Sequence, residues 1–186
     1  MTQNHTIERR AGLLALAALL VACGGDETAE PHPEPQGSAA FTPDAQGEGP
    51  RLWLEAEREG ERSLVTLHGS ELGEIFGWSV HLRFDDALVA IESGDIAPDA
   101  LGSTEDVMPL AVARPADLVL AATRRDPLLG GIAIAEPTPL ATAVLTDVAH
   151  GKGRLELTNV VVRRVDGSYV AVVAHGGSLD TTGGAP

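Results

Sequence analysis

Cys23 is the only cysteine among the 186 residues. It stands where an apolar run, "LLALAALLVA" at 13–22, gives way to the acidic stretch "GGDETAEP". A chain with one cysteine cannot form an internal disulfide, so its fold must be held together by packing alone. The position of the thiol, directly after the apolar run, predicts a role in attaching the chain to something else.

Residues 1–22 have the parts of a secretory signal, because a polar start with Arg9 and Arg10 precedes the apolar run and small residues. The run is about half as long as a membrane-spanning helix requires. Leu20-Val21-Ala22-Cys23 resembles the lipobox of bacterial lipoproteins. In that family the cysteine sulfur receives a diacylglycerol, the chain is cut before the cysteine, and the new amine is acylated.

The resemblance implies that Cys23 carries lipid and holds the mature protein in the membrane of the bacterial cell envelope. Gly24 follows the cysteine where inner-membrane lipoproteins of enteric bacteria tend to have Asp, which favours the outer membrane. The alternative is an ordinary cleaved signal followed by a chance cysteine. Either interpretation predicts an extracytoplasmic protein.

No combination of residues predicts an active site. "HGGS" at His175–Ser178 is similar to an oxyanion-loop motif, but the chain has no G-x-S-x-G sequence to accompany it. A glycine-rich turn is therefore the favoured interpretation. We expect a protein that is not an enzyme and has no catalytic residue.

Metal binding and cofactors are not predicted either. The histidines are scattered and have no metal-ligand spacing: they lie at 5, 32, 68, 81, 150 and 175. Four carboxylates could supply oxygen ligands to calcium, but not at the spacing of an EF-hand: Asp85, Asp86, Asp95 and Asp99. Capping of turns is the expected role of these side chains.

The net charge of the chain is −14. Removal of residues 1–22 would leave 11 basic and 26 acidic residues, a charge of −15. This balance argues against nucleic acid and against anionic lipid headgroups as partners, since both require a basic surface. A protein or a glycan outside the cytoplasm remains as the expected partner.

Residues 23–50 are predicted to be the lipidated cysteine followed by a disordered linker. The segment from 24 to 50 is rich in Pro, Gly and acidic residues, lacks any basic residue and has one aromatic residue, Phe41. As a flexible coil it would span roughly 30 Å on average. The alternative is that Phe41 docks on the folded domain. Residues 181–186 are predicted to be a disordered tail.

Residues 51–180 are predicted to form one β-rich domain. "GWSVHLRF" places Trp78, Val80, Leu82 and Phe84 on one face and polar side chains on the other. About nine such short segments, separated by Gly, Pro and Asp, predict an all-β fold: an antiparallel β-sandwich or barrel. Asp166-Gly167 is a hairpin turn signal between "GRLELTNVVVRRV" and "YVAVVAHGGSL".

The order of these segments resembles the cohesin family. "GWSVHLRFDDALVAIESGDI", "DLVLAATR" and the block "PLATAVLTDVAHGKGRLELTNVVVRRVDGSYVAVVAHGGSLD" carry the resemblance, which runs from about residue 51 to residue 180. It implies a nine-stranded jelly-roll sandwich, shared with several carbohydrate-binding modules. It also implies protein–protein binding, usually to dockerin modules. The chain has no dockerin and only one such domain, so the ligand need not be the family's usual one.

Two surfaces are candidates for binding. A protein partner is expected on the polar face of the sheet, with Ser79, His81, Arg83 and Thr123 as the contacting residues; an ordinary solvated face is the alternative. A glycan would need an exposed aromatic side chain, and Trp53 is the candidate, because it shares a strand face with Glu55. If neither surface binds anything, the protein is a passive structural element of the envelope.

Overall fold

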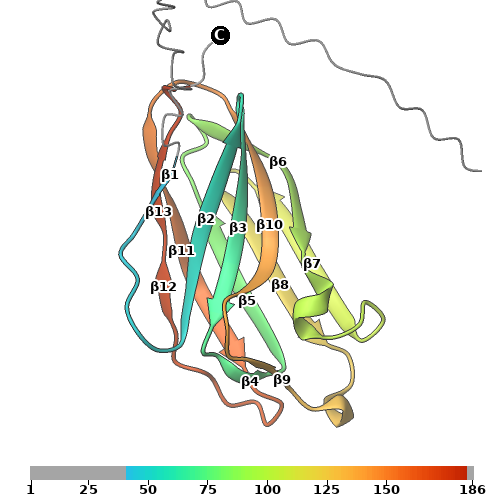
Figure 1. Ribbon diagram of the computed structural model, residues 1–186. Coiled ribbons are helices and arrows are strands. Elements are labelled where there is room, and N and C mark those ends of the chain that lie inside the picture. The colour runs from blue at the N-terminus through green and yellow to red at the C-terminus, as the bar shows by residue number, and fades with distance from the viewer. Residues whose placement is uncertain (1–40, 184–186) are drawn as a thin grey trace, which may run out of the picture. The chain divides into compact units, whose positions relative to one another are not determined.

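The computed structural model describes residues 41–183, which form a sandwich of two β-sheets (Figure 1). Sheet A has six strands, in the spatial order β1 (Phe41–Pro43), β13 (Gly177–Asp180), β11 (Lys152–Arg163), β5 (Gly77–Arg83), β8 (Asp117–Arg124) and β7 (Val107–Arg114). Sheet B has five strands, in the order β12 (Val173–His175), β2 (Arg51–Glu59), β3 (Arg62–Ser70), β10 (Thr138–Asp147) and β6 (Val89–Ile96). The predicted all-β sandwich is confirmed.

The short elements lie in the connections between the long strands. β4 (Gly73–Ile75) and β9 (Ile132–Ile134) pair with each other at one end of the sandwich (Figure 1). The 3₁₀ turns η1 (Pro98–Leu101) and η2 (Pro127–Leu129) are the helical elements within residues 41–183. No helix in this part of the chain is long and apolar enough to cross a membrane.

The core lies between the sheets and is built by strict alternation along the central strands. On β5 the side chains of Trp78, Val80 and Leu82 are at most 3% exposed, while their neighbours on the strand point to the outer face. Leu52 and Leu54 of β2 supply the opposite side. Burying a side chain of this size stabilises the fold by about 1.5 to 3 kcal/mol. The predicted faces of these strands are confirmed.

The predicted strand 169–179 is divided between the two sheets. The predicted hairpin turn at Asp166-Gly167 forms, with φ +83° at Gly167, and a short antiparallel pairing follows it: Tyr169 bridges to Arg163, and the N–H of Val170 donates to the carbonyl oxygen of Val162 at 2.9 Å. β12 pairs in parallel with β2 of sheet B, whereas β13 pairs with β11 of sheet A. Gly176 lies at the crossing, where an added Cβ would be 2.1 Å from the carbonyl oxygen of Leu155. The predicted glycine-rich turn is therefore the point at which the chain changes sheets.

The folded domain begins ten residues earlier than predicted. Phe41 to Pro43 form β1, which pairs with β13, and Phe41 packs against the core. The prediction of a disordered linker is therefore wrong for 41–50, and the alternative, docking of Phe41, is the one that the structure shows. Cys23, the signal sequence and the rest of the predicted linker lie outside the described residues.

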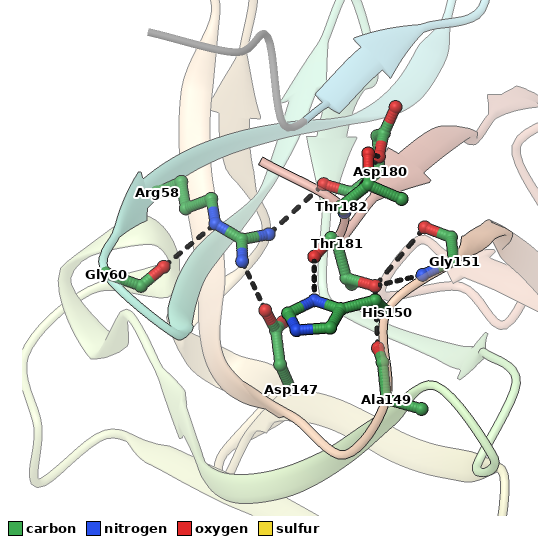
Figure 2. Close-up of polar contacts among 9 residues, drawn as sticks. All are labelled: Arg58, Gly60, Asp147, Ala149, His150, Gly151, Asp180, Thr181 and Thr182. Atoms are coloured by element: carbon green, nitrogen blue, oxygen red, sulfur yellow. Dashed lines mark hydrogen bonds and ion pairs between the residues drawn. The ribbon is translucent and has the colours of Figure 1, made fainter. Parts of the chain in front are cut away.

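Arg58 joins the ends of three strands (Figure 2). Its guanidinium forms an ion pair with Asp147 at the end of β10, and the two side chains are only 9% and 7% exposed. It also donates hydrogen bonds to the carbonyl oxygens of Asp180 on β13, at 3.1 Å, and of Gly60, at 2.8 Å. Because β10 belongs to sheet B and β13 to sheet A, this one side chain links the two layers.

Thr181 fixes the chain directly after β13 (Figure 2). Its hydroxyl donates to the carbonyl oxygen of Ala149 at 2.7 Å and accepts from the backbone N–H of Gly151 at 2.8 Å. Nδ1 of His150 lies 2.9 Å from the Thr181 carbonyl oxygen. Thr181 is 1% exposed. The prediction that the disordered tail starts at residue 181 is therefore wrong for Thr181, since these bonds hold it in place.

Candidate functional site

The outer face of sheet A presents side chains from four adjacent strands, β11, β5, β8 and β7. The register aligns them in rows across the sheet. One row contains Val161, Ser79, Ala121 and Leu110. The next contains Arg163, Gly77, Thr123 and Met108.

The two middle strands carry small side chains in these rows. Gly77 and Ser79 on β5 lie beside Thr123 and Ala121 on β8, and they leave the sheet hollowed between the larger residues of the outer strands. The resulting groove has a volume of about 400 Å³. A groove of that size is large enough to receive several side chains of a partner.

The sides of the groove are apolar and open to solvent. Met108 and Leu110 on β7 are 47% and 51% exposed, and Val161 on β11 is 38% exposed. Tyr169, which follows the turn after β11, is 68% exposed and also lines the groove. A contiguous patch of exposed apolar side chains on an otherwise charged protein is typical of an interaction surface.

A β-bulge in β11 determines which residue faces the groove. The register with β5 shifts between Thr158 and Val161, and Asn159 within the bulge has φ +49°. The extra residue reverses the alternation, so that Val161 points outward and Val162 is buried at 1% exposure. The bulge therefore places an apolar side chain on the groove where uninterrupted alternation would bury it.

Charged side chains border the apolar region. Across one end of the face runs a row of alternating charge formed by Glu156, Arg83, Asp117 and Arg114. His81 lies in the row beside it, and its Nδ1 is 3.1 Å from a carboxylate oxygen of Asp117. Arg163 stands at the opposite end. An apolar centre with a charged rim is the usual anatomy of a protein–protein interface.

This arrangement does not provide a nucleophile. His81 and Asp117 are in contact, as a base and its orienting carboxylate are in many hydrolases. Ser79 lies on the same strand face, but no hydrogen bond joins it to the imidazole. Within residues 41–183 no hydrogen bond joins a serine or threonine hydroxyl to His81, so the pair is a polar contact of the surface.

The structure brings all four residues predicted for partner binding onto this one face. Ser79 and Thr123 line the groove, while His81 and Arg83 lie in the rows toward the charged end. Sequence reasoning missed the apolar sides of the groove. The signal for β7 was present in "VMPLAVA", an uncharged segment that does not alternate between polar and apolar residues.

Trp53 does not provide the exposed platform that a glycan would need. It lies on the outer face of sheet B, as alternation predicts, but it is only 4% exposed. Its ring stacks on His68, with ring centroids 5.2 Å apart, and its Nε1–H donates to Glu55 at 3.1 Å. The expectation that Trp53 is exposed is wrong, because side chains of β2 and β3 cover it.

Two of the four carboxylates considered for calcium bind the backbone. An oxygen of Asp85 accepts a hydrogen bond from the backbone N–H of Ala87 at 3.0 Å, and Asp95 accepts one from Ile96 at 2.8 Å. Among the described residues, no group of three or more His, Cys, Asp or Glu side chains is placed to hold a metal ion. For Asp85 the backbone hydrogen bond is the predicted capping of a turn, whereas Asp95 lies within β6.

Comparisons with solved structures find cohesins. A cohesin module of a family 33 glycoside hydrolase from Clostridium perfringens is 12% identical, with a TM-score of 0.56, over 71% of this chain and 96% of that one. A non-cellulosomal cohesin from the archaeon Archaeoglobus fulgidus is 13% identical, with a TM-score of 0.52, over 68% and 88%. The type I cohesin–dockerin complex of Clostridium thermocellum gives 11% identity, a TM-score of 0.55, and coverage of 73% and 96%.

At these identities the likeness establishes a cohesin-like fold and nothing finer. No family model matches the chain. No curated protein matches its sequence either.

Proposed function

We propose that this protein is a lipid-anchored module outside the cytoplasm that captures a protein partner in the groove on sheet A. The observation that carries the proposal is the groove itself: a hollow with a floor of small side chains, exposed apolar sides and a charged rim. The central apolar contacts would supply most of the binding energy. The charged row around Arg83 would set the orientation of the partner.

The first partner to test is a dockerin. One of the structures with this fold is a cohesin–dockerin complex. The sequence resemblance to cohesins points to the same class of partner. Because the sequence identity to these cohesins is low, the test also includes other proteins of the cell envelope as possible ligands.

The test compares two arginine substitutions at equivalent places on opposite faces. A121R fills the centre of the groove, whereas T142R is its control on the outer face of sheet B, where Thr142 is also half-buried and mid-strand. Four proteins are immobilised: the wild type, A121R, T142R and R83A. Each is incubated with a panel of purified dockerin modules and then with fractionated envelope proteins. Binding is measured by quantitative mass spectrometry and confirmed with the purified ligand.

We expect one ligand to be retained by the wild type and T142R, lost by A121R and weakened by R83A. Equal retention by A121R and T142R would exclude the groove as the binding site. A glycan array run alongside tests the carbohydrate alternative. Absence of any ligand in all arms would favour a passive structural role.

The membrane anchor is a separate part of the proposal and rests on the sequence of Leu20 to Cys23. Several acyl chains, at about 0.8 kcal/mol per buried methylene, would hold the protein on a membrane stably. C23S should yield a protein without lipid that fractionates with soluble material, and outer-membrane fractions should contain the wild type. A C23S protein that remains in the membrane would contradict lipidation at this cysteine.

A further inference from the structure

β7 is an edge strand of sheet A, and among residues 41–183 no strand is hydrogen-bonded to its outer edge, although β6 of sheet B lies close to it. One side of β7 pairs with β8 along its whole length, and no described strand pairs with the other side. Seven consecutive residues, Met108 to Arg114, are exposed. The strand carries no charge from Val107 to Ala113, within a chain whose net charge is −14. Long, apolar, unprotected edges of this kind are templates for pairing with another strand.

The hairpin register shows which backbone groups are free. The turn between β7 and β8 has two residues, so Arg114 and Asp117 form the hydrogen-bonded pair that closes it. Hydrogen-bonded and non-hydrogen-bonded pairs alternate along an antiparallel hairpin. Val112 and Leu110, two and four residues before Arg114, therefore also direct their N–H and C=O groups toward β8. Ala113 and Ala111 therefore direct theirs away from the sheet. Pro109 occupies the next such position, where its missing N–H costs the hairpin nothing.

We propose that a second copy of this chain pairs with that edge, β7 against β7 in antiparallel orientation, with Val112 opposite Val112. In this register Ala111 of each copy lies opposite Ala113 of the other. Each of these two pairs exchanges both of its N–H···O bonds. Registers centred on Ala111 or Leu110 would instead place Pro109 in a pair that needs its N–H. In the register centred on Val112, Pro109 lies opposite Pro115 of the turn, beyond the end of β7 at Arg114, so neither proline interrupts the hydrogen bonds between Ala111 and Ala113.

The charge of the chain favours this edge over the rest of the surface for self-association. Two copies of an acidic protein repel each other, and the repulsion is least where an uncharged strand faces itself. The outer face of sheet B offers no such surface, because Glu55 and Glu57 on β2 are exposed on it. The pairing also brings Val112 of each copy, which is 36% exposed in the single copy, against Val112 of the other.

A hollow beside the edge accommodates the second strand. Close to the β7–β8 turn, an open space of about 280 Å³ lies between the two sheets, lined by Phe84, Val89 and Ala113. In the proposed register, Pro109 of the second copy lies opposite Pro115, which borders the same space. The small side chains of Ala111 and Ala113 leave room for the approach of a second backbone.

The pairing has a consequence for binding. The two-fold axis that relates two antiparallel strands of one sheet runs perpendicular to that sheet. Both outer faces of sheet A therefore point the same way, and two grooves open side by side on a continuous sheet. A dimer would be a bivalent receptor, whose avidity for a paired or repeated partner exceeds the affinity of one groove.

Site-specific cross-linking tests the register in the full-length chain. C23S removes the natural thiol, and single cysteines are then introduced as V112C and M108C. In the proposed dimer the two Val112 Cα atoms are about 4.5 Å apart, as in a non-hydrogen-bonded pair, and a disulfide can form at that separation. The two Met108 side chains would lie at opposite ends of the paired region. We expect mild oxidation to link V112C into dimers and to leave M108C mostly unlinked.

Random collision would give the opposite order, because Met108 is more exposed than Val112. Equal or greater cross-linking of M108C would therefore overturn the proposal. Sedimentation equilibrium gives a second measurement. C23S should sediment as a dimer, and C23S with A111P, which removes an outward N–H, should sediment as a monomer with an unchanged circular dichroism spectrum. A monomeric C23S chain, including one that binds an extended segment of a different protein at this edge, would contradict pairing of two copies.

Discussion

The ring of Phe41 lies directly on the backbone of Gly177, where an added Cβ would be 2.3 Å from Cζ of the ring. Phe41 belongs to the first described strand and Gly177 to the last. The contact is possible only because Gly177 has no side chain. It fixes the beginning of the folded domain against its end.

Replacing Gly177 by alanine should displace β1. We expect G177A to lower the free energy of unfolding by about 1 to 3 kcal/mol, the usual cost of forcing an extra carbon into a packed site. G47A is the matched control, because an added Cβ at Gly47 meets nothing within 4 Å. Urea unfolding should show that G47A stays within about 0.5 kcal/mol of the wild type. Equal stability of both variants would mean that Phe41 does not pack on Gly177.

Breaking the buried ion pair between Arg58 and Asp147 should be more damaging than breaking an exposed one. R58M leaves the carboxylate of Asp147 buried without its partner, which should cost about 3 to 5 kcal/mol. R62M breaks the ion pair of Arg62 with Glu92, whose side chains are 62% and 40% exposed, and should cost at most about 1 kcal/mol. Thermal and urea unfolding of both variants provide the comparison. Similar losses would show that the Arg58 pair is not desolvated.

The intrinsic fluorescence of the folded protein should resist quenching. Trp53 and Trp78 are the only tryptophans, and they are 4% and 3% exposed. Acrylamide and iodide should quench both weakly until the protein is unfolded in urea. W78F isolates the signal of Trp53. Strong quenching of that signal in the folded state would show that Trp53 is exposed, as a glycan-binding platform requires.

The pKa of Asp180 should depend on Thr182. The pKa of this carboxyl lies well below its ordinary value, chiefly because the Thr182 hydroxyl donates to it, with smaller contributions from the Thr182 backbone N–H and Lys152. A lowered pKa stabilises the fold above the pKa of the unfolded state, and this stabilisation is lost as pH falls through the folded value. T182V should therefore raise the pKa, as measured by carboxyl NMR.

The stability difference between the wild type and T182V should be constant above about pH 5 and should shrink as the solution becomes more acidic. K152Q is the comparison variant and should raise the pKa of Asp180 less than T182V does. An unchanged pKa in T182V would show that the hydroxyl does not contact the carboxylate in solution.

The central strands could be predicted from the sequence because their alternation is strict. "GWSVHLRF" assigns Trp78 to the core and His81 to the surface, and the structure agrees. β1 could not be predicted, since three residues have no period and their pairing depends on a strand at the other end of the chain. The division of 169–179 at Gly176 escaped prediction for a similar reason: the need for glycine comes from the carbonyl of Leu155, a distant residue.

The groove was predictable only in part. Alternation placed Ser79 on the outer face, but the depth of the groove depends on Ala121 beside it, and this neighbour follows from the register. The outward position of Val161 depends on the bulge at Asn159, which no pattern indicates. Trp53 was assigned to the correct face, but its burial comes from His68 on the adjacent strand. In each case the missing information is the pairing between strands.

The antiparallel pairing of β1 with β13 determines how the domain would carry a mechanical load. Phe41 lies opposite Leu179, which pairs with Gly153 near the start of β11, whereas the groove lies near Arg163 at the other end of β11. A tether pulling on Phe41, against a partner held in the groove, would pull β1 along its own axis. Its hydrogen bonds would then be sheared together instead of being peeled apart one at a time. Shear is the stronger of the two geometries, and it would suit the proposed role of a module that is anchored on its N-terminal side.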